Sequence, residues 1–300
     1  MNWLLYAILG AVLAGFSPVL AKSGMHKSNS HLAAALRGTF LFLSAWYMVN
    51  RTGTGVSLAG LGQNTFLYLI FSGVATGMVW VCFVRALQLG EVVKVVPIVE
   101  GSVIFTMLVE IFFFHEGLNW NKIIILVVLI AGAVMMGLKG SGRGGRTGSW
   151  LGYAVGAMAL TTVTVVLDRI MYLALDRIVY SSVDSYYERF VRYGIALIVV
   201  WGITFATKGY RGLRAMSFLD GVYLCLSGVS MGGAWYCFHQ AYVMGENVSV
   251  AWVEKFDLVA AVVLGCVLAR EKLTVRAIFG LIFMMVGFWL LQADLPIIPL

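Results

Sequence analysis

Residues 68–91, YLIFSGVATGMVWVCFVRALQLGE, recur 155 positions later as residues 223–246, YLCLSGVSMGGAWYCFHQAYVMGE. The same offset extends upstream without a gap, where it pairs Arg37 with Arg192. Chance does not hold one register over so long a stretch, so the pattern indicates an internal duplication. Two copies of one unit are expected to share one fold.

Composition places the chain in a membrane. Hydrophobic residues make up 61% of the 300 positions and charged residues 12%, whereas soluble domains are about half apolar and a quarter charged. We therefore expect an integral membrane protein, located in the inner (plasma) membrane of the cell. The net charge of +7 is attributed to cytoplasmic loops. Because no basic and aromatic motif accompanies that charge, no nucleic-acid partner is expected.

Ten apolar segments are long enough to cross a bilayer, which takes about 20 residues of helix. They lie at 2–21, 31–49, 65–87, 92–114 and 121–138, and at 150–173, 184–206, 218–243, 247–268 and 275–292. The expected units are a first five-helix repeat at 1–138, a linker at 139–149, a second repeat at 150–292 and a short tail at 293–300. The predicted fold class is an all-α integral membrane protein with ten transmembrane helices.

An odd number of spans in each repeat has a geometric consequence. A five-span unit enters the membrane from the side opposite to its copy, so the two repeats are expected to be inverted about an axis in the membrane plane. Secondary transporters commonly have this arrangement, with the substrate site between the repeats near the bilayer midplane. Most loop Lys and Arg residues fall on one face, which predicts that this face is cytoplasmic and that both termini lie outside.

Arg37 and Arg192 are the most informative charges, because each lies well inside the second span of its repeat. A charge at the bilayer centre costs about 2.5–3.5 kcal/mol on insertion scales, so it needs a partner, water or a function. The planar guanidinium suits a carboxylate or phosphate. One hypothesis is a two-arginine cradle for an anionic group. The alternative is that each arginine is locked to a neighbouring glutamate and ties helices together.

Two spans of the second repeat carry further charges. Glu188 and Arg189 precede Arg192, and Glu254, Lys255 and Asp257 lie within one turn near mid-membrane depth. A central, water-accessible cavity is the simplest place for them, and an internal knot of salt bridges is the alternative. A desolvated Glu254 or Asp257 is also a candidate for binding a coupling proton.

The span at 92–114 combines a proline with charged residues, among them Lys94 and Glu100. Pro97 lacks a backbone donor and predicts a kink in the helix. Pro97 and Lys94 are therefore gating candidates, with plain packing as the alternative. Glu100 lies about half-way across the same span and is a candidate substrate contact or a partner for Arg37 or Arg192.

Aromatic residues near the middle of the chain's two repeated stretches are candidates for the wall of a pocket. They are Trp80, Trp235 and Tyr236. For any one of them, helix packing or an interfacial anchor is the alternative.

Three residues closer to span ends are further gating candidates, namely Arg85, Asp168 and His239. Snorkelling to the interface and, for the histidine, a structural hydrogen bond are the alternatives. For Glu116 and Glu271, capping of the next helix or fixing of a turn is preferred.

The repeated unit resembles a known domain. Two stretches are similar to the end of an EamA domain, the motif Glu116-Gly117-Leu118 and its copy Glu271-Lys272-Leu273-Thr274. Each is followed at the same distance by a glycine, Gly132 in the first half and Gly287 in the second. The run from Ala86 through Gly90 to Pro97 is similar to the middle of that domain. This resemblance implies the ten-helix fold of the drug/metabolite transporter superfamily, which moves amino acids, sugars, phosphorylated metabolites and other small solutes. One departure is Trp252, which stands where a second proline equivalent to Pro97 is often found.

The charges and the resemblance together predict a secondary transporter that moves a small anionic or zwitterionic metabolite by alternating access. The alternatives are a lipid-phosphate flippase and a non-transporting membrane receptor or accessory subunit. No metal-ligand set, nucleophile and base pair, or phosphate-binding loop appears, so neither an enzyme nor a cofactor or metal is expected. The expected partners are a small-molecule substrate, the lipid bilayer and optionally a coupling proton, and a monomer and a homodimer both remain open.

Overall fold

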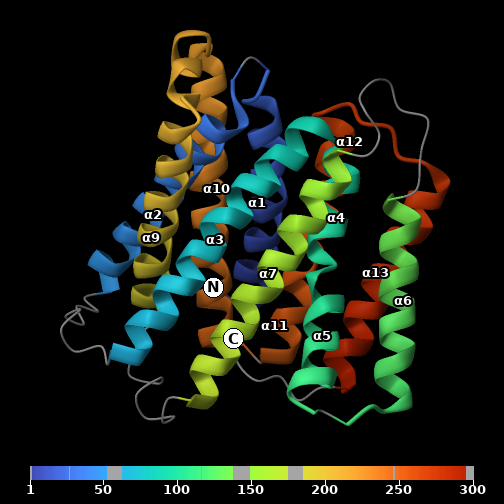
Figure 1. The fold of residues 1–300 in the computed structure, drawn as a ribbon. Helices are drawn as coiled ribbons and strands as arrows, with labels where there is room; N and C mark the ends of the chain where they lie inside the picture. The colour runs from blue at the N-terminus through green and yellow to red at the C-terminus, as the bar shows by residue number, and fades with distance from the viewer. Residues whose placement is uncertain are drawn as a thin grey trace.

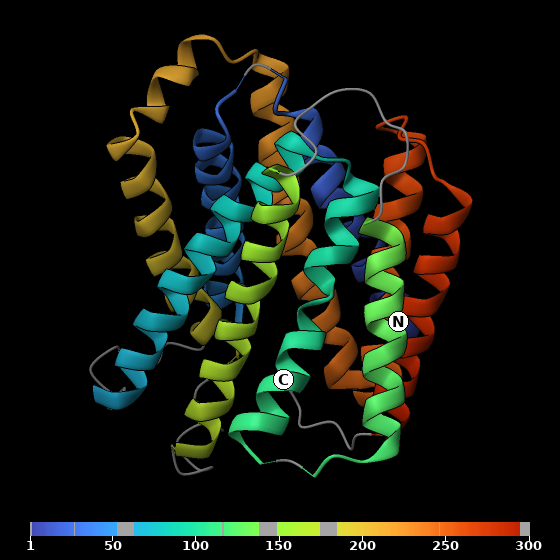
Figure 2. The same ribbon diagram turned by 45° about the vertical axis from the view of Figure 1, so that its right-hand side comes forward.

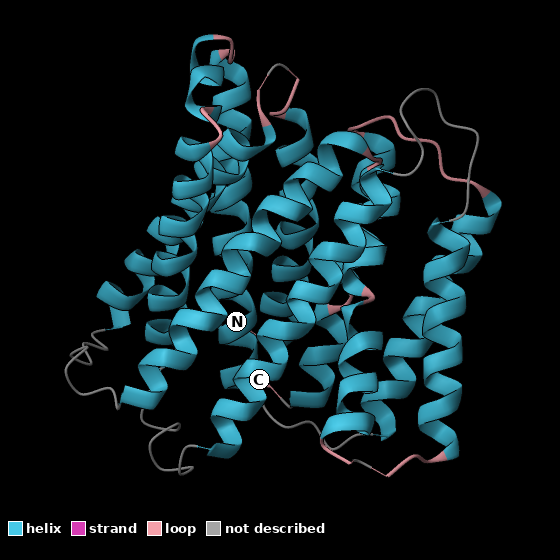
Figure 3. Ribbon diagram, viewed as in Figure 1, coloured by secondary structure: helices cyan, strands magenta, loops and turns pink. Residues whose placement is uncertain are grey.

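The structure is a computed structural model that describes residues 2–26, 28–52, 63–115, 117–137, 149–174, 185–245 and 247–294. Within these ranges every regular element is helical and none is a strand (Figure 3). This confirms the prediction of an all-α fold.

The first half of the chain contains α1 (Trp3–Ser23), α2 (Ser30–Thr52), α3 (Gln63–Leu89), α4 (Val92–Glu100), α5 (Ser102–Phe113) and α6 (Trp120–Gly137). The second half contains α7 (Ser149–Ala174), α9 (Ser185–Ala206), the short 3-10 helix η2 (Gly209–Arg214), α10 (Phe218–Met244), α11 (Asn247–Glu254), α12 (Phe256–Val267) and α13 (Val275–Asp294). Four helices of the first half therefore start 155 residues before a helix of the second half. These are α2 and α9, α3 and α10, α4 and α11, and α6 and α13.

Eight described segments are long and apolar enough to cross a membrane, and one of them combines α4 and α5. Large apolar side chains such as Phe113 and Trp120 are exposed on the outside of the helices. In water this surface would be unfavourable, whereas lipid matches it. The protein is therefore a multi-pass membrane protein.

The segments expected at 92–114 and 247–268 are each interrupted in the middle. In the first, α4 ends at Glu100 three residues after Pro97, and the Gly101 N–H closes the turn on the carbonyls of Pro97 and Ile98. The second is interrupted at Lys255, between α11 and α12, although no proline is present there. The kink predicted from Pro97 is thus a break between two helices, and an unpredicted break lies at the equivalent place in the second half.

The two halves interlock through pairs of helices. The first helix of each half packs along the third helix of the other, because α1 lies against α10 and α7 lies against α3. Two further contacts join equivalent helices, α2 with α9 and α6 with α13, and the latter pair stands at one side of the bundle (Figures 1 and 2). Exchanging the halves therefore preserves these four contacts.

Two pairs of glycines bring the helices of the arginines close to their neighbours. On α3, a Cβ added at Gly73 would lie 3.0 Å from the carbonyl oxygen of Arg192. On α10, a Cβ at the equivalent Gly228 would lie 2.5 Å from the carbonyl oxygen of Arg37. Each glycine is followed four residues later by another, at Gly77 and Gly232, which is the spacing that lets membrane helices pack closely.

Candidate functional site

Arg192 is held by two carboxylates. Its Nη1 and Nη2 atoms donate to Asp168 on α7 at 2.9 and 2.6 Å, a bidentate pair. Nη2 also donates to Glu188, one turn earlier on α9. Ser72 on α3 donates a longer bond of 3.4 Å to the same Asp168. Arg192 therefore matches the alternative in which an arginine is locked to neighbouring acids, and its charge is already compensated.

Arg37 has a different environment, although it holds the equivalent position. Only 4% of the residue is exposed, and Nε and Nη2 donate to the hydroxyls of Ser227 and Ser17, both at 3.1 Å. The guanidinium lies 5.7 Å from the centre of the Phe83 ring. No carboxylate in the described ranges forms an ion pair with it. Arg37 is therefore a buried cation whose described partners are neutral.

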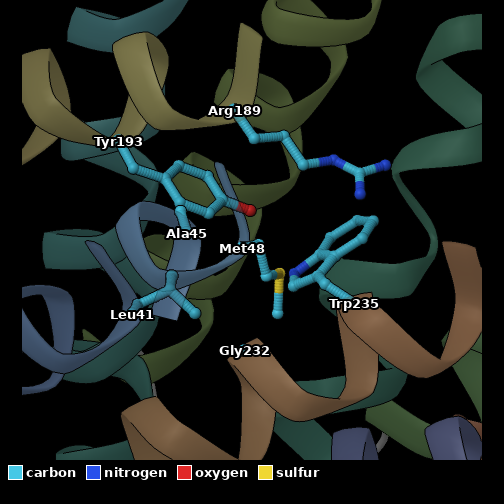
Figure 4. A pocket seen from close by; sticks show the side chains of 7 residues that line it. All are labelled: Leu41, Ala45, Met48, Arg189, Tyr193, Gly232 and Trp235. Atoms are coloured by element: carbon cyan, nitrogen blue, oxygen red, sulfur yellow. The ribbon is translucent and has the colours of Figure 1, made fainter. Parts of the chain in front are cut away.

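Arg189 lines a small cavity between α2, α9 and α10. Its guanidinium stacks 4.4 Å from the centre of the Trp235 ring, and Tyr193 and Met48 lie beside it (Figure 4). The full lining is Leu41, Ala45, Met48, Arg189, Tyr193, Gly232 and Trp235. Within the described residues Arg189 forms no ion pair with an acid. The cavity thus combines one available cation with an apolar and aromatic wall.

Tyr193 is within electrostatic range of Arg192 and also of Arg37 and Arg189, the two that form no ion pair with an acid in the described ranges. The buried tyrosine interacts electrostatically with both Arg37 and Arg189, and its hydroxyl points toward the cavity (Figure 4). Trp80 packs against its ring with the centroids 5.3 Å apart. Trp80 therefore contacts the tyrosine ring, whereas Trp235 lines the same cavity as Tyr193. Tyr193 was not among the candidates from sequence, because a tyrosine inside a membrane span is unremarkable by itself.

The volume of this cavity is about 10 Å³, roughly the room that one water molecule needs. The water-accessible chamber expected from the sequence is therefore closed in this conformation. A second hollow, of about 390 Å³, lies at the surface where η2 leads into α10. It is lined by residues 216–226 and contains none of the predicted site residues.

The charges of the α11–α12 break form a second group. Lys255 Nζ lies 3.4 Å from Glu100 Oε2, at the end of α4, and 5.5 Å from the centre of the Phe288 ring. The hydroxyl of Tyr242 on α10 donates to Glu254 Oε2 at 2.7 Å. Asp257 interacts electrostatically with all three of these charged residues. The partner of Glu100 is therefore Lys255, rather than Arg37 or Arg192 as suggested from sequence.

The remaining candidates lie apart from these two groups. Lys94 pairs with Glu91 on its own helix at 2.6 Å, and Arg85 donates to Gln88 at 2.6 Å. Pro97 is buried next to the helix break. His239 lies half-buried on α10, and Tyr236 is 41% exposed on the same helix, away from the cavity lining. Asp168 belongs with Arg192, as described above.

Glu271 has a role that the sequence assigned only in part. Its carboxylate accepts bonds from the N–H groups of Val92 and Val93, both at 2.9 Å, and pairs with Lys22 at 2.8 Å. It therefore caps α4 of the other half, and not the helix that follows it in the chain. Glu116, the equivalent residue, lies outside the described ranges.

The comparisons with known proteins agree with this architecture. Residues 1–138 match the model of the EamA-like transporter family. A Sinorhizobium sp protein named "Uncharacterized transporter in cobO 3'region" is 30% identical over 135 residues, which are 45% of this chain and 96% of the relative. That relative is thus about as long as one half of this chain. The chain belongs to the EamA-like transporter family.

A solved crystal structure of another protein has the same fold. It superposes with a TM-score of 0.59 over 95% of this chain and 94% of its own, at 15% sequence identity. At this identity the likeness concerns the fold alone. Together with the family match, it confirms the resemblance that the duplicated motifs indicated.

Proposed function

We propose that this chain is a ten-span secondary transporter of the plasma membrane that moves a small anionic or zwitterionic metabolite by alternating access, without a catalytic step. The observation that carries the proposal is the position of Arg37 and Arg189. Both interact electrostatically with Tyr193, and neither pairs with an acid in the described ranges. Two such guanidinium groups around one hydroxyl favour a carboxylate or phosphate as the ligand.

Ten spans require two more than the eight that length and composition identify. The first is α10, whose 27 residues would extend about 40 Å at 1.5 Å per residue, more than a hydrocarbon core. The second is α11 with α12, which correspond in position to α4 with α5. Five spans in each half would make the halves inverted repeats. The four helix contacts that remain the same when the two halves are exchanged support this arrangement.

The two groups of charges suggest how a substrate would be oriented. An acidic end would contact Arg189 and Arg37, while an apolar body would lie on Trp235. An amine on the same molecule would point toward Glu254, because Tyr242 contacts Glu254 and also interacts electrostatically with Arg189. The aromatic wall with few polar groups is typical of small-molecule sites.

The small volume of the cavity fits a closed stage of the transport cycle. In alternating access the halves rock around a central site that opens to one side at a time. A stage without substrate in which the lining side chains collapse on one another would leave little free volume. Opening would then separate α2 and α9 from α10, the helices that line the cavity.

A binding screen followed by transport tests the proposal. We expect one class among amino acids, monocarboxylates and phosphate monoesters to raise the unfolding temperature of the protein in nanodiscs, because a ligand that binds the folded state stabilises it. Radiolabelled members of that class should enter liposomes by counterflow. Arg189→Gln and Arg37→Gln should each weaken binding about tenfold to a hundredfold, the effect of a lost charge-assisted hydrogen bond.

Arg211→Gln is the matched control, because Arg211 is exposed on η2, away from the cavity. It should bind and transport like the wild type. Normal transport by both Arg189→Gln and Arg37→Gln would contradict the proposal. Stabilisation only by lipid-linked phosphates would favour a flippase, and binding without uptake would favour a receptor.

A further inference from the structure

The two helix breaks meet at the interface of the halves. Glu100, at the end of α4, and Lys255, between α11 and α12, hold positions 155 residues apart and form an ion pair with each other. The equivalent residues of the two repeats therefore carry opposite charges and join at one point. Around this point α4 packs on α12, and α11 and α12 both pack on α1.

The acids at this point outnumber the cations. Glu100, Glu254 and Asp257 provide three carboxylates, and Lys255 is the cation among them. Lys255 compensates Glu100, and the Tyr242 hydroxyl bonds to Glu254. Asp257 forms no ion pair in the described ranges, and the group that bonds to its carboxylate is the Leu258 N–H on its own helix. Its Oδ1 atom is buried and makes no hydrogen bond.

In the part of the chain that the structure describes, no cation on a helix packed against α12 forms an ion pair with Asp257. α1 contains no charged residue between Trp3 and Ala21. On α4, Lys94 is paired with Glu91. Arg189 on α9 interacts electrostatically with Tyr242 and Tyr193. An ionised Asp257 would thus be an uncompensated charge inside the bilayer, which proteins avoid because its desolvation is costly.

We propose that Asp257 is a proton-binding residue, and that it carries one proton in this closed conformation. A proton from water adds to the carboxylate and gives a neutral carboxylic acid. The group of charges where the two helix breaks meet then has one negative charge fewer than it would have with Asp257 ionised. When the halves separate and water reaches the break, the acid releases the proton and becomes ionised. The proton would thereby be coupled to the opening of the halves, and this coupling rests on the proposed transport function, whereas the proton binding does not.

Infrared spectroscopy of the substrate-free protein tests the proton binding directly. In nanodiscs at neutral pH, the wild type should show the C=O band of a protonated carboxylic acid that shifts in heavy water. The band should be absent in Asp257→Asn and in Asp257→Ser, which copies Ser102 at the equivalent position of the first half. Glu91→Gln is the control, because Glu91 pairs with Lys94 outside this group, and it should keep the band.

The wild-type spectrum keeps the proposal testable even if the asparagine and serine variants fail to fold. Absence of a protonated carboxylic acid band in the wild type at neutral pH would overturn the proposal, as would an unchanged band in a folded Asp257→Asn. Asp257→Glu should keep a band at a shifted position.

In liposomes, the anion identified by the binding screen should accumulate in response to an imposed pH gradient, and Asp257→Asn should lose that response. Gradient-independent uptake by the wild type would remove the coupling while the transport function stands.

Discussion

Arg37 and Arg192 occupy equivalent positions in the two halves, yet their surroundings differ in charge. Arg192 is bound by Asp168 and Glu188, whereas Arg37 is bound by two serine hydroxyls. At the 155-residue offset Glu188 is matched by Ala33, and Ser17 takes the place beside Arg37 and Ser227 that Asp168 takes beside Arg192 and Ser72. Both halves thus have the arginine, and the second half also has its acidic counter-ions. A cation without counter-ions is the one suited to bind an external anion.

The same asymmetry extends along the two helices. On α9 the side chains of Glu188, Arg189 and Tyr193 surround the cavity and the ion pair, and the corresponding residues on α2 are alanines and a glycine. The glycine, Gly38, leaves room for Trp80, because a Cβ there would lie 2.7 Å from that ring. The two halves therefore have similar helices, but the charged and aromatic side chains at this candidate site come mainly from the second half.

The largest expected effect comes from giving Arg192 the environment of Arg37. The double variant Asp168→Asn, Glu188→Gln leaves Arg192 buried without an acid. Removing the partners of a buried ion pair costs about 3–5 kcal/mol, so we expect a loss of that size in the free energy of unfolding, measured by denaturant titration in mixed micelles. Adding Arg192→Gln should recover part of it. An unchanged free energy of unfolding would mean that the two environments are not energetically different.

The converse exchange gives Arg37 a counter-ion. Ser17→Asp places a carboxylate on α1 where Arg37 now donates to a hydroxyl, the place that Asp168 takes beside Arg192. An internal carboxylate would compete with the external anion for Arg37, and affinity should fall by about 1.5–3 kcal/mol, the value of a charge-assisted hydrogen bond. Calorimetric titration of the anion identified by the binding screen measures this. Ser17→Asn, which has nearly the same shape as Ser17→Asp and no charge, should bind more tightly than Ser17→Asp.

The close packing behind each arginine is tested by adding a methyl group. Gly228→Ala would place a Cβ 2.5 Å from the backbone of α2 at Arg37, and overpacking of this kind costs about 1–3 kcal/mol. Gly73→Ala, where the distance is 3.0 Å, should cost less. Gly202→Ala on α9 is the control, because no atom lies within 4 Å of the added group. Thermal unfolding of the three variants should rank them in this order.

Much of the fold could be predicted from the sequence, because the duplication and the apolar segments are local or periodic signals. The expected starts at 218, 247 and 275 coincide with α10, α11 and α13. Pro97 indicated the interruption of the first broken span. The interruption at Lys255 was missed, since Trp252 replaces the proline and the break is supported by charges from another helix. The membrane orientation predicted from loop charges stays a prediction.

The partners of the site residues were harder to predict. Arg37 bonds to Ser227, 190 positions away, and such contacts depend on which faces of α1, α2 and α10 meet. Serines inside membrane helices are ordinary, so Ser17 and Ser227 gave no signal. The available signal was comparative: the offset places Tyr193 opposite Gly38 and Arg189 opposite Ala34. The positions where the two copies carry different residue types therefore include residues that line the candidate site.

The smallest expected effect concerns the two tryptophans, which hold equivalent positions and have different neighbours. Trp235 supports the Arg189 guanidinium, whereas Trp80 packs on Tyr193 in the core. Trp235→Leu should weaken anion binding by about 0.5–1 kcal/mol, the value of a cation–π contact at an accessible site, because Arg189 would lose its orientation and keep its charge. Trp80→Leu should mainly lower the unfolding temperature, since it removes a buried ring. Calorimetry and thermal unfolding on both variants separate the two roles, and equal losses of affinity would show that the aromatic residues act alike in both halves.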